Sequence, residues 1–272
     1  MKISVLMSIY IKENPKFLKQ AIDSVLKQTL LPEQIVMVKD GPLTTELDDL
    51  INGYSETYSN LFTIVTLEKN MGLGFALAEG VKKCRNPLIA RMDTDDICAE
   101  KRFEIQQHAF LTNPKLDIIG SYIAEFDRSI TDIISYRKVP VGYENILKYA
   151  KARNPFNHMT VMYKKEAVIK AGNYTTFHGF EDYYLWVRML VNGATAENIP
   201  ESLVYARTGI GMFERRGGFK YALTEINLQK KLLQAKFITT DEFMKNCMLR
   251  VATRLVPNSI RKVIYLKIIR KV

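Results

Sequence analysis

Strand-like and helix-like segments alternate along the first hundred residues of this 272-residue chain. The apolar segment 3–9 has the pattern of a buried strand, and Asn14-Pro15 behind it supplies an N-cap and a first-turn proline for a helix. Successive strand–helix units connect parallel strands through right-handed crossovers. We therefore expect an α/β fold with a mostly parallel central sheet flanked by helices. The other strand patterns cover 34–39, 62–67 and 88–92, and the other helix patterns begin at Thr45 (with Asp48 as a capping box), Gly74 and Glu100.

Three carboxylates occupy four positions directly after the fourth strand pattern, in the sequence Asp93-Thr94-Asp95-Asp96. Alternate side chains of an extended segment point the same way, so Asp93 and Asp95 can converge. Carboxylates held that close repel each other unless a cation lies between them, and hard oxygen ligands suit Mg2+ or Mn2+ on a substrate phosphate. The simpler interpretation is a turn in which Asp95 or Asp96 caps the helix expected at 100–113. That would explain one aspartate, whereas three favour a metal site.

Polar segments follow the other strand patterns as well. In parallel α/β sheets, ligands bind beyond the carboxyl ends of the strands. A glycine-rich stretch, 72–78, resembles a dinucleotide-binding motif, but that motif should join the first strand to its helix, and here it follows the third. We therefore expect a ligand site at the strand ends without a dinucleotide. The segments at this edge are Ser8-Ile9-Tyr10, Asp40-Gly41, Asn70-Met71-Gly72 and the aspartate cluster.

The composition is that of an ordinary globular protein, with 47% apolar residues. Cys84, Cys98 and Cys247 lie far apart and show neither disulfide nor zinc spacing. The apolar start of the chain is too short for a signal peptide, and no run reaches the length of about 18 to 20 apolar residues that spans a bilayer. We therefore expect a cytoplasmic protein.

The net charge of +10 is concentrated near the C-terminus. Residues 243–272 contain eight Lys or Arg and no Asp or Glu, which leaves 31 basic against 29 acidic residues, a net of +2, in the first 242. This basic and apolar end could lie on an anionic membrane surface or bind nucleic acid. A helix packed on the body with a solvated basic side explains it equally well.

The second half of the chain has a looser pattern. Strand-like segments at 117–126, 133–139 and 158–163 alternate with short helix patterns, and we expect them to extend the same sheet. A second carboxylate pair, Glu181-Asp182, precedes the aromatic, helix-like run 183–190. Acids in the first turn of a helix are favoured by the helix dipole, and the aromatic side chains are expected in the core.

The order of these pieces resembles a known family. A buried strand, a strand ending in Asp-Gly, an Asn-x-Gly loop, a strand ending in Met-Asp-x-Asp-Asp and a late Glu-Asp are typical of family 2 of the inverting nucleotide-sugar glycosyltransferases, which have the GT-A fold. Bacterial members that build capsular polysaccharide, exopolysaccharide and O-antigen are especially similar. The resemblance covers about residues 1–215, divided into a nucleotide-binding half (1–113) and an acceptor half (114–215), and leaves 216–272 as a basic helical extension.

The resemblance implies roles for the residues that match its motifs. Asp40 would hydrogen-bond the uracil or other base, with Tyr10 and Glu13 along the base and ribose. Asp93 and Asp95 would bind the ribose and the metal on the diphosphate. Further donor-binding candidates are Ser8, Asn70, Gly72 and Thr94, together with Arg91, which could instead form a salt bridge to Asp96.

Asp182 matches the catalytic base of the family. In an inverting transfer the acceptor hydroxyl must lose its proton as it attacks the anomeric carbon, and a positioned carboxylate can accept that proton. The departing nucleoside diphosphate develops charge that a divalent ion and nearby cations neutralise. Arginines in a later segment could supply these cations from a loop, or could form a solvated turn: Arg207, Arg215 and Arg216. Two further residues are candidates for contacts with the acceptor, Glu181 and His158, and His158 could instead be a structural histidine.

The function implied is transfer of a sugar, with inversion, from a nucleotide-sugar donor of the UDP type to a saccharide or undecaprenyl-diphosphate-linked acceptor. The expected location is the cytoplasm or the anionic cytoplasmic face of the membrane, and no nucleic-acid partner is expected. A sugar nucleotidyltransferase would carry a Gly-rich, basic loop after the first strand, which 8–13 lacks. A catalytically weak sugar-nucleotide-binding or scaffolding protein is the other alternative, against which the intact acids Asp93, Asp95 and Asp182 argue.

Overall fold

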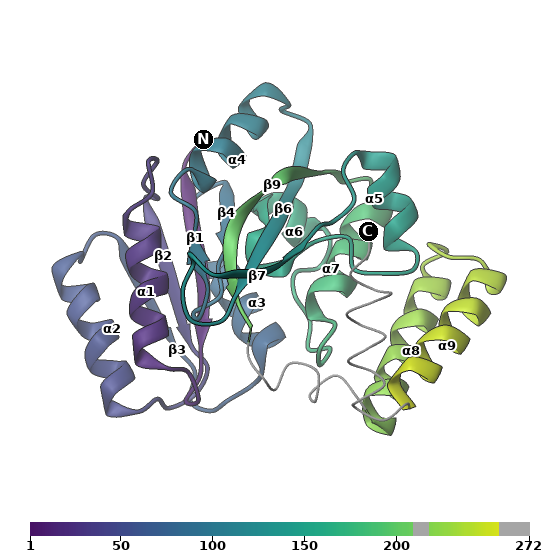
Figure 1. Ribbon diagram of the computed structural model, residues 1–272, viewed down its shortest axis with the longest axis horizontal. Helices are drawn as coiled ribbons and strands as arrows, with labels where there is room; N and C mark the ends of the chain where they lie inside the picture. The colour runs from purple at the N-terminus through teal and green to yellow at the C-terminus, as the bar shows by residue number, and fades with distance from the viewer. Residues whose placement is uncertain (209–217, 256–272) are drawn as a thin grey trace.

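The computed structural model describes residues 1–208 and 218–255, and within these ranges one nine-stranded sheet runs through the molecule (Figure 1). The strand order is β3-β2-β1-β4-β8-β6-β9-β5, with β7 paired to β6. Strands β1 to β4 are parallel, and the short β8 lies antiparallel between β4 and β6, so that β6 and β9 run in the same direction as β1. The predicted α/β fold with a mostly parallel sheet is confirmed.

The elements alternate along the chain as the sequence indicated. The strands are β1 (Ile3–Ile9), β2 (Gln34–Lys39), β3 (Phe62–Thr66), β4 (Leu88–Arg91), β5 (Ile97–Cys98), β6 (Leu116–Phe126), β7 (Ile133–Arg137), β8 (Met162–Lys164) and β9 (Thr195–Arg207). The helices are α1 (Pro15–Leu26), α2 (Thr45–Thr57), α3 (Leu73–Lys83), α4 (Arg102–Thr112), α5 (Tyr143–Ala150), α6 (Lys165–Lys170), α7 (Glu181–Val191), α8 (Phe219–Gln234) and α9 (Thr240–Leu255), with a 3-10 turn η1 at His158–Thr160.

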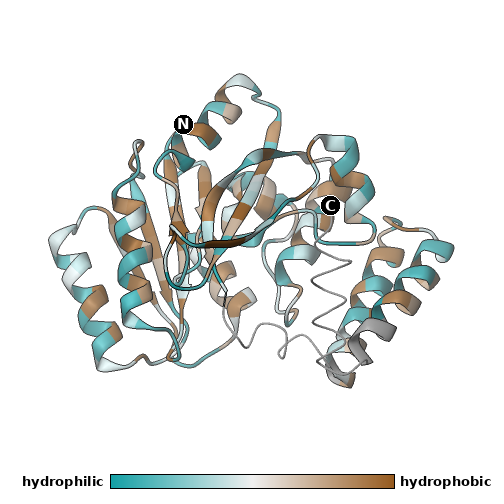
Figure 2. Ribbon diagram, viewed as in Figure 1, coloured by the Kyte–Doolittle hydropathy of each residue, from teal (hydrophilic) through white to brown (hydrophobic). Residues whose placement is uncertain are grey.

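Two apolar layers enclose the sheet. Alternate residues of β1 point to opposite faces, so Val5 and Met7 join one core cluster and Leu6 joins the other. Helices α1, α2 and α4 bury their apolar sides in the first cluster, and α3, α5, α6 and α7 bury theirs in the second. Trp186 of α7 is 1% exposed and contacts four other aromatic rings in the second layer. Strands β1, β2 and β4 are consequently buried on both faces, as expected of parallel strands, and consist mostly of hydrophobic residues (Figure 2).

Helices α8 and α9 form a hairpin beside the body, at the right of Figure 1. Leu228 and Leu232 of α8 pack with Tyr183 and Val187 of α7 in a third apolar cluster. This hairpin lies within residues 216–272, the segment for which the sequence predicted a basic helical extension. The remaining basic residues of that extension, from Pro257 onward, lie outside the described residues.

Three local expectations change in the structure. Thr44, one residue before the predicted Thr45, is the N-cap of α2 and accepts the backbone N–H of Leu47. The helix after the aspartate cluster begins at Arg102, so neither Asp95 nor Asp96 caps it. Strand β9 is absent from the predicted strands; it contains Pro200, and its pairing with β6 skips Pro200 and Glu201 at an irregularity, where proline is tolerated. No helix within 1–208 or 218–255 has the length and apolarity that crossing a bilayer requires.

Candidate active site

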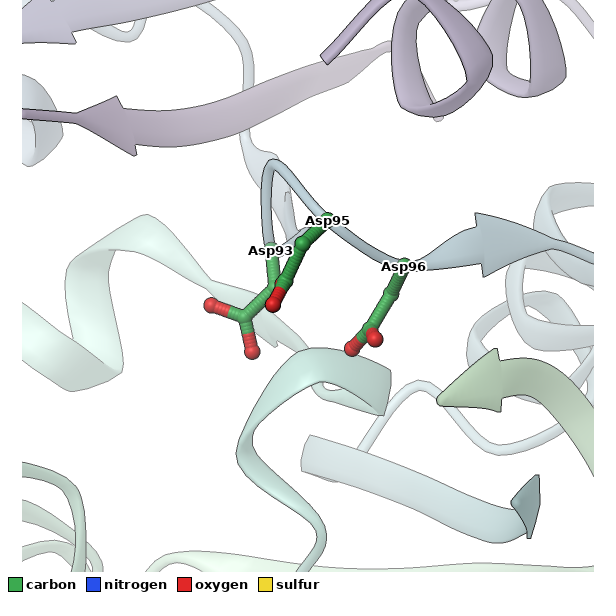
Figure 3. Close-up of side chains that lie close together, drawn as sticks. All are labelled: Asp93, Asp95 and Asp96. Atoms are coloured by element: carbon green, nitrogen blue, oxygen red, sulfur yellow. The ribbon is translucent and has the colours of Figure 1, made fainter. Parts of the chain in front are cut away.

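Three carboxylates converge where β4 ends. Their nearest oxygens, one each from Asp93, Asp95 and Asp96, all lie within 4.8 Å of one another. Figure 3 shows the three side chains leaving the short loop between β4 and β5 on the same side. Because β1, β2 and β4 are parallel, this loop lies at the carboxyl edge of the sheet, as the sequence predicted.

The charges of this cluster are only partly balanced by protein cations. Arg91, which is 1% exposed, forms an ion pair with Asp93 and not with Asp96. Burial and the charge of Asp93 raise the pKa of Asp95 to about 6, and the same causes, with Asp95 added, hold the pKa of Asp96 well above its usual range. Arg91 is buried and forms its ion pair with Asp93 instead of the Asp96 partner considered above, while its contact with the nucleotide stays a prediction.

Arg207, the last residue of β9, fixes the aspartate loop from the other side. Its backbone N–H donates to Asp96 Oδ1 at 2.8 Å, and its Nε donates to the backbone oxygen of Asp95 at 3.1 Å. Its guanidinium carbon lies 3.8 Å from the ring centre of Phe17 and 4.5 Å from that of Phe126. The side chain is therefore held between α1, β6 and the loop.

The loop between β3 and α3 is tied to the end of β2 by Asp40. This buried carboxylate accepts the backbone N–H of Met71 at Oδ1 (2.7 Å) and that of Gly72 at Oδ2 (3.0 Å). Asn70 Nδ2 donates to the backbone oxygen of Asp40 at 3.3 Å. Gly41 has a φ of +89°, and a Cβ there would lie 2.6 Å from the backbone nitrogen of Asn70. The Asp-Gly and Asn-x-Gly segments of the sequence thus form one interlocked edge.

The loop after β1 brings one more carboxylate to the cluster. Burial, followed by the charges of Asp95 and Asp93, raises the pKa of Glu13 to about 7. Ser8 and Tyr10 are half-buried at the end of the same strand. These residues follow a parallel strand to the same edge of the sheet as the aspartates, and their contacts with a donor stay a prediction.

Asp182 lies in the first turn of α7. Its Oδ1 accepts the backbone N–H of Tyr183 at 2.7 Å, and its Oδ2 accepts Nδ2 of Asn154 at 2.6 Å. Its neighbour Glu181 is buried, and burial raises the pKa of that carboxyl to about 7. The N-terminus of α3 packs against this turn so closely that a Cβ on Gly74 would lie 2.8 Å from Cγ of Glu181. The turn that carries Asp182 therefore packs against α3, the helix that follows the Asn-x-Gly loop.

Residues 4–173 match the model of glycosyl transferase family 2. The chain belongs to this family. The UDP-Gal:alpha-D-GlcNAc-diphosphoundecaprenol beta-1,3-galactosyltransferase of Escherichia coli is 40% identical to this family 2 chain over 270 residues, which cover 99% of it and 97% of the relative. The amylovoran biosynthesis glycosyltransferase AmsE of Erwinia amylovora is 37% identical over 269 residues, covering 97% of this chain and 98% of the relative.

Solved structures share the fold of this family 2 glycosyltransferase. Crystallised S. aureus TarS 1-349 in complex with UDP-GlcNAc matches with a TM-score of 0.67 at 17% identity, over 98% of this chain and 76% of that chain. Mannosyltransferase PcManGT from Pyrobaculum calidifontis, in complex with GDP-Man and Mn2+, matches with a TM-score of 0.67 at 15% identity, over 98% and 75%. Together with the family match, these structures confirm the expected GT-A fold.

Among the acceptor-side candidates of this glycosyltransferase, His158 lies in an aromatic cluster. Its Nε2 is 3.1 Å from the hydroxyl of Tyr174, and its ring contacts Trp186 edge-on. Burial and the charge of Arg91 lower the pKa of His158 well below its usual range, so the imidazole is neutral. These contacts agree with the structural histidine interpretation. The other two arginines considered for the diphosphate, Arg215 and Arg216, lie outside the described residues.

Two site features of this family 2 chain were not anticipated from the sequence. Asn154 lies in a loop between α5 and η1, 28 residues before Asp182, and no spacing pattern connects the two. Arg207 was expected either as a cation on a loop or in a solvated turn, whereas it ends β9 and contacts the aspartate loop and two aromatic rings. The sequence feature that could have predicted this position is the apolar segment 203–206 directly before Arg207, which was not recognised as part of a strand.

Gly41 combines a positive φ with a close backbone neighbour at this edge of the site. We predict that Gly41→Ala lowers the free energy of unfolding by about 1 to 3 kcal/mol, because alanine is strained at this φ and its Cβ meets the backbone of Asn70. Gly53 within α2 is the matched control, since a Cβ there meets nothing within 4 Å, and Gly53→Ala should be neutral or stabilising by about 1 kcal/mol. Urea denaturation measures both. Equal stability of the two variants would contradict this account of the edge.

Proposed function

We propose that this glycosyltransferase moves a hexose, with inversion, from a UDP-sugar to a saccharide acceptor carried on a lipid diphosphate. The observation that carries the reaction class is the convergence of three carboxylates at the carboxyl edge of the sheet. The E. coli relative, 40% identical over 99% of the chain, bears a name that supports a galactosyl donor and a diphosphoundecaprenol-linked acceptor. The AmsE relative supports a place in the synthesis of a bacterial surface polysaccharide.

The donor set of the cluster fits a divalent cation. Three carboxylates provide hard oxygen ligands within 4.8 Å, and Arg91 pairs with only one of them. We propose that Asp93 and Asp95 hold Mg2+ or Mn2+, while Asp96 is occupied by the N–H of Arg207. When bound, such an ion supplies charge neutralisation for the departing diphosphate.

The protein's own groups supply the remaining chemistry in this proposal. Asp182 accepts the proton of the acceptor hydroxyl, with Glu181 as the next candidate because its raised pKa of about 7 also suits a base. Asp40, Asn70 and Gly72 form the edge beside which the base of the donor would bind. Ser8, Tyr10, Glu13 and Thr94 line the same edge as further proposed donor contacts.

We also propose that the enzyme works on the anionic cytoplasmic face of the membrane, where a lipid-linked acceptor resides. The α8–α9 hairpin exposes several large apolar side chains, with Phe219 69% and Met248 72% exposed. Lys230 and Lys245 are exposed on the same two helices. The sequence beyond Leu255 adds five more basic residues and no acidic one. Apolar and basic groups together favour anionic lipid, each basic residue contributing about 1 kcal/mol.

A first prediction tests the metal site. Asp95→Ala should abolish transfer and the binding of Mn2+ in the presence of UDP, measured by calorimetry, while the fold stays intact because one of several repelling acids is removed. Asp132→Ala, at an exposed aspartate of the β6–β7 turn, is the control and should behave as wild type. Full transfer activity in excess chelator would exclude the metal.

A panel of UDP-sugars scored for UDP release, including UDP-galactose and UDP-GlcNAc, identifies the donor.

A second prediction concerns the base. Asp182→Asn keeps the shape of the side chain and removes its capacity to accept a proton, so kcat should fall by about 100-fold or more while KM for the donor stays near the wild-type value. Glu181→Gln in the same helical turn is the matched comparison and should retain most of the rate. If Asp182→Asn weakens donor binding without lowering kcat, or if Glu181→Gln causes the larger loss, the assignment moves away from Asp182.

A third prediction concerns the membrane. The double variant Leu223→Glu, Met248→Glu should sediment less than wild type with vesicles that contain anionic lipid. Binding of the wild-type protein should weaken as salt is added, because at physiological ionic strength screening limits electrostatic attraction to a distance of about 8 Å. Leu111→Glu is the control, since Leu111 on α4 is 54% exposed, close to the 50% of Leu223. A variant truncated before Pro257 measures how much of the vesicle binding depends on the residues from Pro257 onward. Wild-type protein that ignores anionic vesicles at low salt would refute the proposal.

A further inference from the structure

The side chain of Asn154 contacts the proposed base directly. Its Nδ2 donates to Asp182 Oδ2 at 2.6 Å, joining the loop after α5 to the first turn of α7. The other oxygen, Oδ1, accepts the backbone N–H of Tyr183 at 2.7 Å. Each carboxylate oxygen of Asp182 therefore has a donor in a fixed position. Rotation of the carboxylate would break one of these two hydrogen bonds.

The amide of Asn154 is itself oriented. Its Oδ1 accepts the backbone N–H of Phe156 at 3.2 Å. The reversed amide would lose this bond and would turn an oxygen lone pair toward the Asp182 carboxylate, which carries only acceptors when ionised. The hydrogen-bonding partners thus select the orientation in which the NH2 group points at Asp182.

The loop that carries Asn154 is anchored on two sides. The backbone oxygen of Pro155 accepts Nδ2 of Asn198, a residue of β9 that is 1% exposed, at 3.0 Å. The ring of Phe156 packs edge-on against Trp186, with ring centres 5.9 Å apart. Trp186 lies four residues after Asp182 in α7, so this ring contact also joins the loop to the helix that carries Asp182. Asn154 consequently approaches Asp182 from a rigid support.

We infer that Asn154 is a positioning residue that orients the Asp182 carboxylate toward the acceptor hydroxyl and stabilises its ionised form. This inference rests on the proposed role of Asp182 as base. A hydrogen bond to the charged form of a carboxylate favours that form. A neutral amide suits this task, because a lysine or arginine there would weaken the basicity of Asp182 further and a second carboxylate would repel it.

The test compares Asn154→Ala and Asn154→Asp with wild type in transfer from the active UDP-sugar to a synthetic GlcNAc-diphosphate lipid. In Asn154→Ala, kcat should fall by about 10- to 100-fold with KM for the donor unchanged, since a small misplacement of a catalytic group has effects of this size. The acidic limb of the pH–rate profile should move to higher pH, because the carboxylate loses a hydrogen bond to its ionised form. Asn154→Asp, nearly isosteric, should move the limb further.

Asn145→Ala provides the matched control. Asn145 lies on α5, is exposed, and donates its Nδ2 only to the nearby backbone oxygen of Val141 among the described contacts, so its loss should leave rate and pH profile unchanged. A wild-type rate and profile in Asn154→Ala, with Asp182→Asn inactive, would overturn the inference and leave the base assignment in place. A lower kcat with an unmoved acidic limb in both Asn154 variants would also overturn it, since that result indicates a structural role. Full activity of Asp182→Asn would remove the base and the inference together.

Discussion

Mutual repulsion among Asp93, Asp95 and Asp96 is the constraint on which the site depends, because carboxylates within 4.8 Å separate unless the surrounding structure holds them. Two arginines contribute to this. Arg91 pairs with Asp93 from within the core, and Arg207 bonds the loop through its backbone N–H and its Nε. Both are supported by packing, since Arg91 is buried and Arg207 lies against two aromatic rings.

A third arginine stabilises the strand that presents the cluster. Arg102 is fully buried at the start of α4, and its Nη2 donates to the backbone oxygen of Arg91 at 2.7 Å. Its Nε donates to Gln106 Oε1 at 3.0 Å, and its Nη1 contacts the sulfur atoms of Met92 and Cys98. A buried guanidinium is costly unless its donors are satisfied, and here backbone oxygens and soft sulfur atoms satisfy them. Arg102 thus holds the end of β4 in place, although it forms no hydrogen bond to the three aspartates among the described contacts.

The second half of the chain carries the proposed base, Asp182, and enters the same sheet as the first half. Strand β8 lies antiparallel beside β4, and β6 and β9 follow, so that the loop carrying Asn154 and the first turn of α7 are attached to the frame of the donor edge. The close packing at Gly74, against Thr175 and Glu181, joins the Asn-x-Gly loop to that turn. Two sets of carboxylates from distant parts of the sequence therefore belong to one continuous core, which would keep the proposed base at a fixed distance from the aspartate cluster.

The sequence by itself determined the alternation of strands and helices, the gathering of polar motifs at the carboxyl edge of the sheet and the family. These follow from local periodicity and from short polar motifs, which neighbouring residues encode. It also indicated Asp40, Asp93, Asp95 and Asp182, because each stands at the end of a recognisable pattern. Only the tertiary structure decided which partners these acids have. Arg91 turned out to pair with Asp93, Arg207 to be held by aromatic rings, and Asn154 to contact Asp182, because such contacts depend on distances between elements far apart in the chain that no periodicity records.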